Sequence, residues 1–321
     1  MSKNVPLVYI IVLTWNGRED TLECIKSLCQ SNYPNYRILL VDNASSDDTV
    51  RVVKSEFPDI EVLENPSNLG YAEGNNLGIQ YAIKQGAEFL LILNNDIIMD
   101  RSAVTILVNA TSQDPNAFIT TPAVYKYSSP DETAFRRKVW DSTALRFRSA
   151  ENFPEIAETR VSAGPVVVPS LPTVEMLPTA LAPGCSLFLS PAVIRQVGLF
   201  DSRFFIYWEE TDWCTRAVRQ GCRIFLVPAA KVWHKESRSF AKESQRSAYH
   251  YYYFRNRLLW IEKNLQGSNR WLPMLRCLRE LVKPLHPRYE SDLSDGRILV
   301  FRARLLGAWH YLIRRFGRLR T

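Results

Sequence analysis

Two short polar segments hold the residues of this sequence that are best suited to chemistry. The first is Asn94-Asn95-Asp96, which directly follows an apolar run at residues 89–93. The second is Glu209-Glu210-Thr211-Asp212, which follows a run of aromatic side chains. Amide and carboxylate oxygens suit a hydrated divalent cation and the phosphates bound to it. Clustered carboxylates beside aromatic surface raise one another's pKa, which makes one of them a useful general base near neutral pH.

Each segment also has a simpler interpretation. The polar trio could be a turn that ends a core strand, and acidic residues in the first turn of a helix complement the helix dipole. His234 is one of only four histidines and ends the last sheet-like segment of the chain. A lone histidine is more often structural than a ligand, but a neutral imidazole could join Asp96 on a cation.

The elements that would position these residues follow from the apolar pattern. Strands are expected at residues 8–13, 37–41, 61–63, 89–93, 117–125 and 223–227, and helices at 18–31, 49–57, 73–85 and 97–109. Strands that alternate with helices at this pace indicate βαβ units and a parallel sheet with right-handed crossovers. Polar residues follow the first four strands, as expected for a nucleotide cleft at the carboxyl edge of the sheet.

Two other nucleotide-binding classes fit less well. No G-x-G-x-x-G follows the first strand, which disfavours a dinucleotide dehydrogenase. No Walker A pattern is present either. A nucleotidyltransferase would need a basic, glycine-rich phosphate loop after the first strand, and that loop is missing as well. The long irregular region at residues 128–179 is typical of a functional excursion or a mobile loop.

Composition and charge indicate the class of protein and its expected location. The 321 residues are 46% hydrophobic and 23% charged, which is typical of a globular protein. The net charge is +7, and residues 270–321 alone carry 12 Lys+Arg against 4 Asp+Glu. This basic end predicts contact with an anionic surface. Six cysteines without a C-x-x-C pair, no signal-peptide pattern and no spanning apolar run predict a cytoplasmic protein, soluble or peripheral.

The basic end has helical periodicity. Its apolar positions recur at near-helical spacing, and they are Ile298, Phe301, Leu305, Ala308, Leu312 and Phe316. Seven arginines lie between Arg297 and Arg320. The pattern predicts a basic amphipathic helix on an anionic leaflet, and the alternative is a helix packed on the catalytic domain.

Taken together, these segments resemble the family 2 inverting glycosyltransferases with the GT-A fold. The chain is most similar to the rhamnosyltransferase-like branch, which builds bacterial surface polysaccharides. The motifs that carry the resemblance are Ile11-Val12-Leu13-Thr14-Trp15-Asn16, Val41-Asp42-Asn43-Ala44-Ser45-Ser46-Asp47, Asn68-Leu69-Gly70-Tyr71-Ala72-Glu73-Gly74-Asn75-Asn76, Leu93-Asn94-Asn95-Asp96, Pro183-Gly184-Cys185, the acidic segment 200–216, Val232-Trp233-His234 and Tyr251-Tyr252-Tyr253-Phe254-Arg255-Asn256.

The resemblance implies an α/β GT-A fold with a mainly parallel central sheet flanked by helices and a helical, basic C-terminal extension. The implied catalytic domain is 1–240, with a donor half at about 1–125 and an acceptor half at about 126–240, followed by the helical region 241–321. The implied donor-binding residues are Thr14, Asn16, Asp42, Asn68, Gly70, Asn75, Asn95 and Asp96. The first three would hold the base and ribose, whereas Asn68 and Gly70 would shape the pocket floor. Asp96 would bind Mg²⁺ or Mn²⁺ on the diphosphate, with His234 as a second ligand.

The acidic segment would supply the base. The family usually has Glu-Asp where this chain has Glu209-Glu210, and Glu210 falls at the position of the usual base. Its carboxylate lies one methylene further out, so Asp212 remains an alternative base. The metal motif is Asn-Asn-Asp rather than Asp-x-Asp, and one carboxylate fewer implies weaker affinity for the cation.

The expected function is therefore transfer of a sugar, with inversion, from a nucleoside-diphosphate sugar to a glycan or lipid-linked acceptor. The branch resembled suggests dTDP-rhamnose as the donor. The expected location is the inner face of the cytoplasmic membrane, with peripheral contact through the basic helix and no nucleic-acid partner. The alternative is a catalytically silent GT-A module that binds a sugar nucleotide or glycan as a scaffold.

Overall fold

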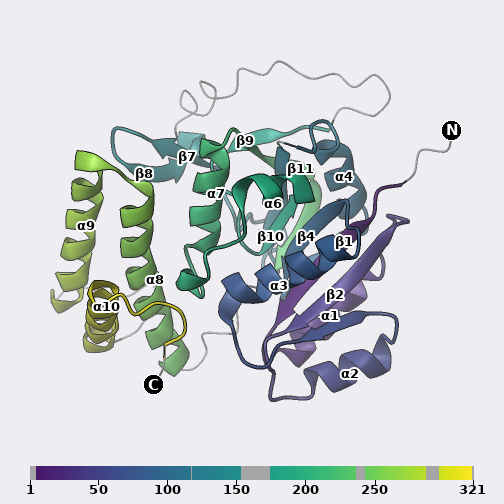
Figure 1. The fold of residues 1–321 in the computed structure, drawn as a ribbon, viewed down its shortest axis with the longest axis horizontal. Coiled ribbons are helices and arrows are strands. Elements are labelled where there is room, and N and C mark those ends of the chain that lie inside the picture. Colours follow the sequence, from purple (N-terminus) through teal and green to yellow (C-terminus); the bar gives the residue numbers. More distant parts are fainter. Residues whose placement is uncertain (1–4, 117, 153–173, 236–242, 287–295, 320–321) are drawn as a thin grey trace.

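The computed structural model describes residues 5–116, 118–152, 174–235, 243–286 and 296–319. Within them one mixed sheet has the strand order β3-β2-β1-β4-β10-β6-β11-β5, and β9 pairs with β11 (Figure 1). Its strands are β1 (Val8–Thr14), β2 (Tyr36–Asp42), β3 (Glu61–Glu64), β4 (Phe89–Asn94), β5 (Ile97–Met99), β6 (Phe118–Lys126), β9 (Leu177–Thr179), β10 (Ser186–Leu189) and β11 (Arg223–His234).

Helices cover both faces of this sheet because its central strands are apolar on both sides. In β1, Val8, Ile10 and Val12 pack into one core and Tyr9 and Ile11 into the other, and all five are fully buried. The first core is closed by α1 (Arg18–Leu28), α2 (Thr49–Glu56) and α4 (Ala103–Thr111). The second is closed by α3 (Gly70–Lys84), α6 (Pro191–Val197) and α7 (Glu209–Arg219). The predicted α/β class with a mainly parallel, helix-flanked sheet is confirmed.

Two local predictions were wrong. The helix expected from Ile97 begins only at Ala103, because residues 97–99 form β5 and pair antiparallel with β11. The segment expected to stop at Val227 continues as one strand to His234, with an irregular register between Val227 and Lys231. Apolar runs of three residues fit a strand edge or a helix start equally well, so periodicity could not separate them.

Part of the irregular region 128–179 is ordered. It contains a hairpin of β7 (Lys138–Asp141) and β8 (Arg146–Ser149), a short 3-10 helix (Ala150–Asn152) and β9. The remainder of this prediction, at residues 153–173, lies outside the described residues.

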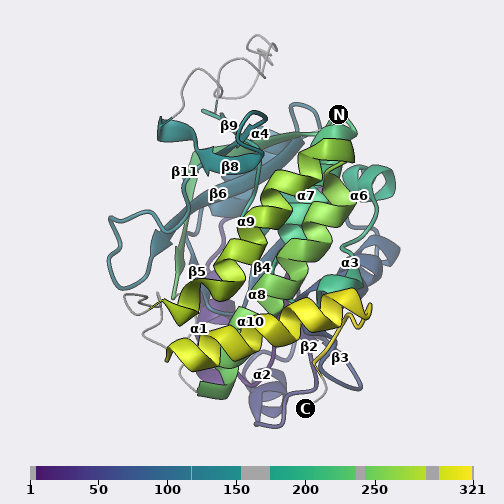
Figure 2. The ribbon, with the colours of Figure 1, turned by 90° about the vertical axis from the view of Figure 1, so that its left-hand side faces the viewer.

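The C-terminal extension is helical, as predicted. It consists of α8 (Glu243–Asn264), α9 (Trp271–Val282) and α10 (Arg297–Leu312), with the short 3-10 helices η4 (Gly267–Arg270) and η5 (Lys283–Leu285). α8 packs against α7, and α9 and α10 lie on its outer side (Figures 1 and 2). Among the described residues no helix combines the length and apolar character needed to cross a bilayer.

Candidate active site

The carboxyl ends of β1, β2 and β4 meet at one edge of the sheet (Figure 1). Parallel pairing places Thr14, the last residue of β1, opposite Asp42, the last residue of β2. β4 ends beside them at Asn94, and Asn95 and Asp96 follow directly. The residues predicted to bind the donor and the cation therefore lie next to one another at the ends of these three strands. Open α/β sheets bind their ligands at this edge.

Two residues that were predicted to bind the donor, Asn16 and Asp42, hold the loop that follows β2 in place at this edge. Asn16 has a φ of 52° and accepts a 2.7 Å hydrogen bond from the backbone N–H of Ser46. Asp42 is buried, and its carboxylate accepts hydrogen bonds from the hydroxyl and the backbone N–H of Ser45, the latter at 3.0 Å. These contacts fix the loop as a rim above the strand ends.

Thr14 lies beneath this edge rather than on its surface. It is 1% exposed, and its hydroxyl is 2.8 Å from that of Thr21. The side-chain amide of Asn95 donates to both hydroxyls, at 3.3 Å to Thr14 and 3.0 Å to Thr21. Thr14 thus orients Asn95, and any contact between Thr14 and a donor would be indirect.

Gly70 is the first residue of α3, and Asn68 lies two residues before it; both were predicted to shape the pocket floor. The side-chain oxygen of Asn68 accepts from the N–H of Gly70 at 2.9 Å. Gly70 has a φ of 80°, and a Cβ at this position would lie 2.4 Å from the Phe205 ring, so only glycine fits. Asn75 differs, because it is fully buried in α3 and donates to the carbonyl of Tyr71 at 3.0 Å. A donor could not reach it in this structure.

Asp96 and His234 come together although they are far apart in sequence. β5 pairs with the end of β11, so His234 lies opposite Ile97. The Nε2 atom of His234 is 3.2 Å from Oδ1 of Asp96, and both side chains are mostly buried. A carboxylate oxygen and an imidazole nitrogen are suitable protein ligands for Mn²⁺. No group of three or more His, Cys, Asp or Glu side chains gathers for a metal within the described residues.

Glu209 and Glu210 form a carboxyl pair at the start of α7. Glu209 is 4% exposed and Glu210 is half-buried. Burial raises the pKa of both carboxyls, and the charge of Glu210 raises the pKa of Glu209 further. Thr211 donates to Oε1 of Glu210 at 3.2 Å, and this contact favours the charged form of Glu210. Both pKa values are therefore raised, which suits a carboxyl pair that can take up a proton near neutral pH.

Asp212 is engaged elsewhere, which corrects its place as an alternative base. It is fully buried and faces α8. Its carboxylate accepts from Arg216 at 3.0 Å, from Lys263 at 3.0 Å and from Asn264 at 2.9 Å. A carboxylate with two cations and an amide around it has no room for an acceptor hydroxyl, and its role is to hold α7 against α8.

The backbone before the glutamates is strained and is held from α8. Phe205, Tyr207 and Trp208 have φ values of 65°, 68° and 72°. Arg255 is fully buried and donates to the carbonyl of Phe204 at 3.1 Å. Asn256 is also fully buried and donates to the carbonyls of residues 204, 206 and 207 at 2.6, 2.8 and 2.9 Å. The motif Tyr251–Asn256 was the sequence signal for this support, but it did not reveal the role.

Comparisons with known proteins point to one family of enzymes. Residues 9–164 match the family model "Glycosyl transferase family 2". The chain is 26% identical to the low-salt glycan biosynthesis hexosyltransferase Agl10 of Haloferax volcanii, over 78% of this chain and 74% of that protein. It is 23% identical to the N-acetylglucosaminyl-diphospho-decaprenol L-rhamnosyltransferase of Mycobacterium tuberculosis, over 75% and 80%. It is 21% identical to the dTDP-rhamnosyl transferase RfbF of Shigella flexneri, over 86% and 84%.

Solved structures share the fold. The chain matches GalNAc-T7, solved with UDP, GalNAc and Mn²⁺, with a TM-score of 0.58 and 14% identity, over 88% of this chain and 58% of that one. It matches the mannosyltransferase PcManGT of Pyrobaculum calidifontis, solved with GDP-Man and Mn²⁺, with a TM-score of 0.53 and 16% identity, over 99% and 77%. The chain therefore has a glycosyltransferase family 2 domain at residues 9–164 and the GT-A fold, and it is similar to rhamnosyltransferases.

Proposed function

We propose that this chain transfers a sugar, with inversion, from a nucleoside-diphosphate sugar to a hydroxyl of a glycan or lipid-linked acceptor. The observation that carries the proposal is the pair of Glu209, which is buried, and Glu210, which is half-buried, at the start of α7, where α8 holds the preceding backbone in place. α3 links this pair to the donor edge. Its first residue, Gly70, contacts the segment before the pair, and the hydroxyl of Tyr71 donates to the carbonyl of Gly184, which lies beside Glu210.

The proposed reaction is a single displacement. Glu210 takes the proton of the acceptor hydroxyl while the hydroxyl oxygen bonds to the anomeric carbon from the face opposite the diphosphate. The bond from that carbon to the diphosphate oxygen breaks, and the nucleoside diphosphate leaves. In this proposal Glu209 is the protonated partner, so the glutamate pair carries one negative charge before the reaction and Glu210 can accept a proton.

Asp96 and His234 would hold a divalent cation, Mg²⁺ or Mn²⁺. Their facing oxygen and nitrogen atoms, 3.2 Å apart, suit such an ion, and two protein ligands leave its other positions to phosphates and water. When bound, the cation neutralises negative charge on the leaving diphosphate. Mn²⁺ also accompanies the sugar nucleotide or nucleotide in the two solved relatives described above.

The donor would lie along the strand ends. Asn16 and Asp42 shape the rim, Asn95 faces the same edge, and Asn68 and Gly70 form the floor. The similarity to the dTDP-rhamnosyl transferase RfbF supports dTDP-rhamnose as the donor. We assign residues 1–240 to catalysis, with a donor half at about 1–125 and an acceptor half at about 126–240.

Besides packing against the catalytic domain, the region 241–321 would bind the membrane surface. Seventeen large hydrophobic side chains are exposed in the described residues, and twelve of them lie between Trp271 and Ile313. In α9 they form one stripe of Trp271, Leu275, Leu278 and Val282, and in α10 another of Ile298, Leu305, Trp309 and Leu312. Apolar stripes on the outer face of packed helices mark a surface for a partner.

An anionic bilayer is the partner that the charge favours. Exposed cations surround the stripes, and they are Arg270, Arg279, Lys283, Arg297, Arg302, Arg314, Arg315 and Arg318. Each cation near an anionic surface contributes about 1 kcal/mol to binding. A second copy of the chain would instead bring like charges together. α9 and α10 share one outer side of the molecule (Figure 2), so both stripes could meet the inner face of the cytoplasmic membrane, where surface polysaccharides are assembled.

Release of nucleoside diphosphate from a panel of sugar nucleotides tests the proposal. The assay needs a membrane extract as the acceptor source and is repeated with chelator and with Mn²⁺ restored. We expect release from one donor, loss on chelation and recovery with the ion. Asp96→Ala should remove the recovery at low Mn²⁺, whereas Asn94→Ala should retain it. Absence of release from every donor would contradict the proposed reaction.

A further inference from the structure

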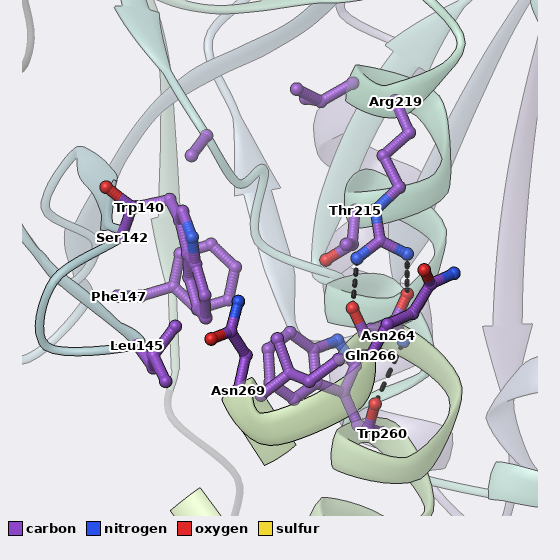
Figure 3. A pocket seen from close by; sticks show the side chains of 13 residues that line it. Trp140, Ser142, Leu145, Phe147, Thr215, Arg219, Trp260, Asn264, Gln266 and Asn269 are labelled. Atoms are coloured by element: carbon purple, nitrogen blue, oxygen red, sulfur yellow. Dashed lines mark hydrogen bonds between the residues drawn. The ribbon is translucent and has the colours of Figure 1, made fainter. Parts of the chain in front are cut away.

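A cavity of about 490 Å³ lies away from the strand-end edge. It is open to solvent on one side and bordered by the β7–β8 hairpin, the second half of α7 and the corner between α8 and η4 (Figure 3). Nothing in the proposed reaction uses it. Its dimensions fall within the range of small-molecule sites, and its lining combines aromatic surface with a few polar groups, as such sites do.

Three aromatic side chains form one side and the base of the cavity. The rings of Trp140 and Phe147 are 5.0 Å apart, and each lies 5.8 Å from the ring of Trp260 (Figure 3). Trp140 and Phe147 are only partly covered, so their faces remain available. The hairpin that carries them is tied down by Arg276 of α9, which donates to the carbonyl of Ala144 at 2.5 Å.

Uncharged polar groups complete the lining. Asn269, Gln266 and Ser142 are exposed at the cavity, and the amide of Asn269 points toward the aromatic pair (Figure 3). Trp260 is 4% exposed, and its indole N–H donates to no acceptor in the described part of the chain. The indole nitrogen is itself covered, so Trp260 offers the cavity aromatic surface, and the polar contacts would come from the three exposed side chains.

The charge of the lining excludes a phosphate-bearing ligand. Arg219 is its one ionisable residue, and its guanidinium already donates to the carbonyl of Asn264 and, at 3.2 Å, to the side-chain oxygen of that residue. A nucleotide would need uncommitted cations for its phosphates. Aromatic faces next to amides and hydroxyls instead match a sugar ring, which has apolar C–H faces and hydroxyl edges.

We propose that this cavity binds a sugar unit of the acceptor glycan, at a distance from the hydroxyl that reacts. The proposal rests on the proposed function and names where its acceptor is recognised. α7 connects the two places, because Thr215 of the lining follows Glu210 by five residues, about 8 Å along the helix axis. The two places are also about 140° apart around the helix, so an oligosaccharide of several units that follows the surface of α7 could occupy both.

A glycan array tests the proposal without requiring catalysis. Labelled full-length protein is applied, without donor, to printed bacterial surface oligosaccharides of one to six units. We expect binding to at least one oligosaccharide, about fivefold weaker for Asn269→Ala and at least about tenfold weaker for Trp140→Ala. Asn269 is exposed, so its variant should fold even if Trp140→Ala does not. Tyr127→Ala, which removes an exposed aromatic residue just after β6, is the matched control and should bind like the wild type.

The outcomes separate this site from the reaction. No binding to any printed oligosaccharide, or equal binding by the wild type and Asn269→Ala, would overturn the sugar site. The nucleoside diphosphate assay is run in parallel on the same variants. A wild-type protein that consumes donor yet fails on the array refutes the cavity alone, whereas one that binds glycan but consumes no donor refutes the proposed reaction.

Discussion

The side-chain nitrogen of Asn256 in α8 lies 2.9 Å from the carbonyl oxygen of Tyr207, two residues before Glu209. The same amide is 2.6 Å from the carbonyl oxygen of Phe204. Tyr207 and Trp208 occupy left-handed conformations that cost a non-glycine residue about 1–2 kcal/mol each. One buried amide from the C-terminal helices therefore stabilises the backbone that aims the glutamate pair.

Asn256→Ala should lower kcat far more than it changes the donor KM. The segment before Glu209 would lose its anchor, and misplacement of a catalytic group by about 1 Å can cost about 100-fold in rate. Steady-state kinetics with varied donor measure both constants, and thermal unfolding confirms that the variant is folded. A folded variant with kcat within threefold of the wild type would show that Asn256 does not position the base.

Gly70→Ala should destabilise the protein much more than Gly86→Ala. Both glycines have positive φ values, 80° and 85°, so both variants bear the same conformational cost. A Cβ at Gly86 meets nothing within 4 Å, whereas at Gly70 it would lie 2.5 Å from the carbonyl oxygen of Phe205. Overpacking of this kind costs about a further 1–3 kcal/mol. Chemical denaturation of the two variants gives the difference, and equal losses would mean that the contact relaxes easily.

Glu209 should make the wild type less stable as the pH rises. Burial raises the folded-state pKa of this carboxyl well above 4.5, its ordinary value. The folded state therefore binds more protons than the unfolded state above pH 4.5, and the stability conferred by that proton is lost as the pH rises through the folded pKa. Glu209→Gln removes this titration. The melting temperature of the variant minus that of the wild type should therefore increase from pH 5 to pH 9. A difference that stays constant over this range would contradict a raised pKa of Glu209.

The sheet and most of the strand-end site were predictable from the sequence, but the arrangement around the glutamates was not. A continuous apolar run such as β4 fits a central strand that is buried on both faces of a parallel sheet. The residues that follow such a strand must lie at the carboxyl edge of the sheet. Asp212 contacts Lys263, and Asn256 donates to the carbonyl of Tyr207. Both contacts depend on packing between segments about fifty residues apart in the sequence. Local periodicity contains no signal for such pairs, so Asp212 remained a plausible base until its partners were known.

Binding to anionic vesicles should depend on the apolar stripes of α9 and α10. Leu275 and Trp309 are 47% and 56% exposed, one on each helix. Leu275→Glu combined with Trp309→Glu replaces apolar contacts by charges that an anionic surface repels, and should reduce flotation with phosphatidylglycerol vesicles at least about tenfold. The control is Tyr127→Glu, in the loop that follows β6, where the tyrosine is 48% exposed. This variant should float with the vesicles as the wild type does. Unchanged flotation of the double variant would exclude these stripes as the docking surface.

The turnover of Glu210→Gln, compared with that of Glu209→Gln, tests the central claim most directly. Glutamine at 210 cannot accept a proton, so the rate should fall about 10²–10⁴-fold. Glutamine at 209 resembles the protonated glutamate that the raised pKa implies, so the rate at neutral pH should stay within about tenfold of the wild type. The account predicts this asymmetry, and it would be contradicted by near wild-type turnover in Glu210→Gln or by equal losses in the two variants.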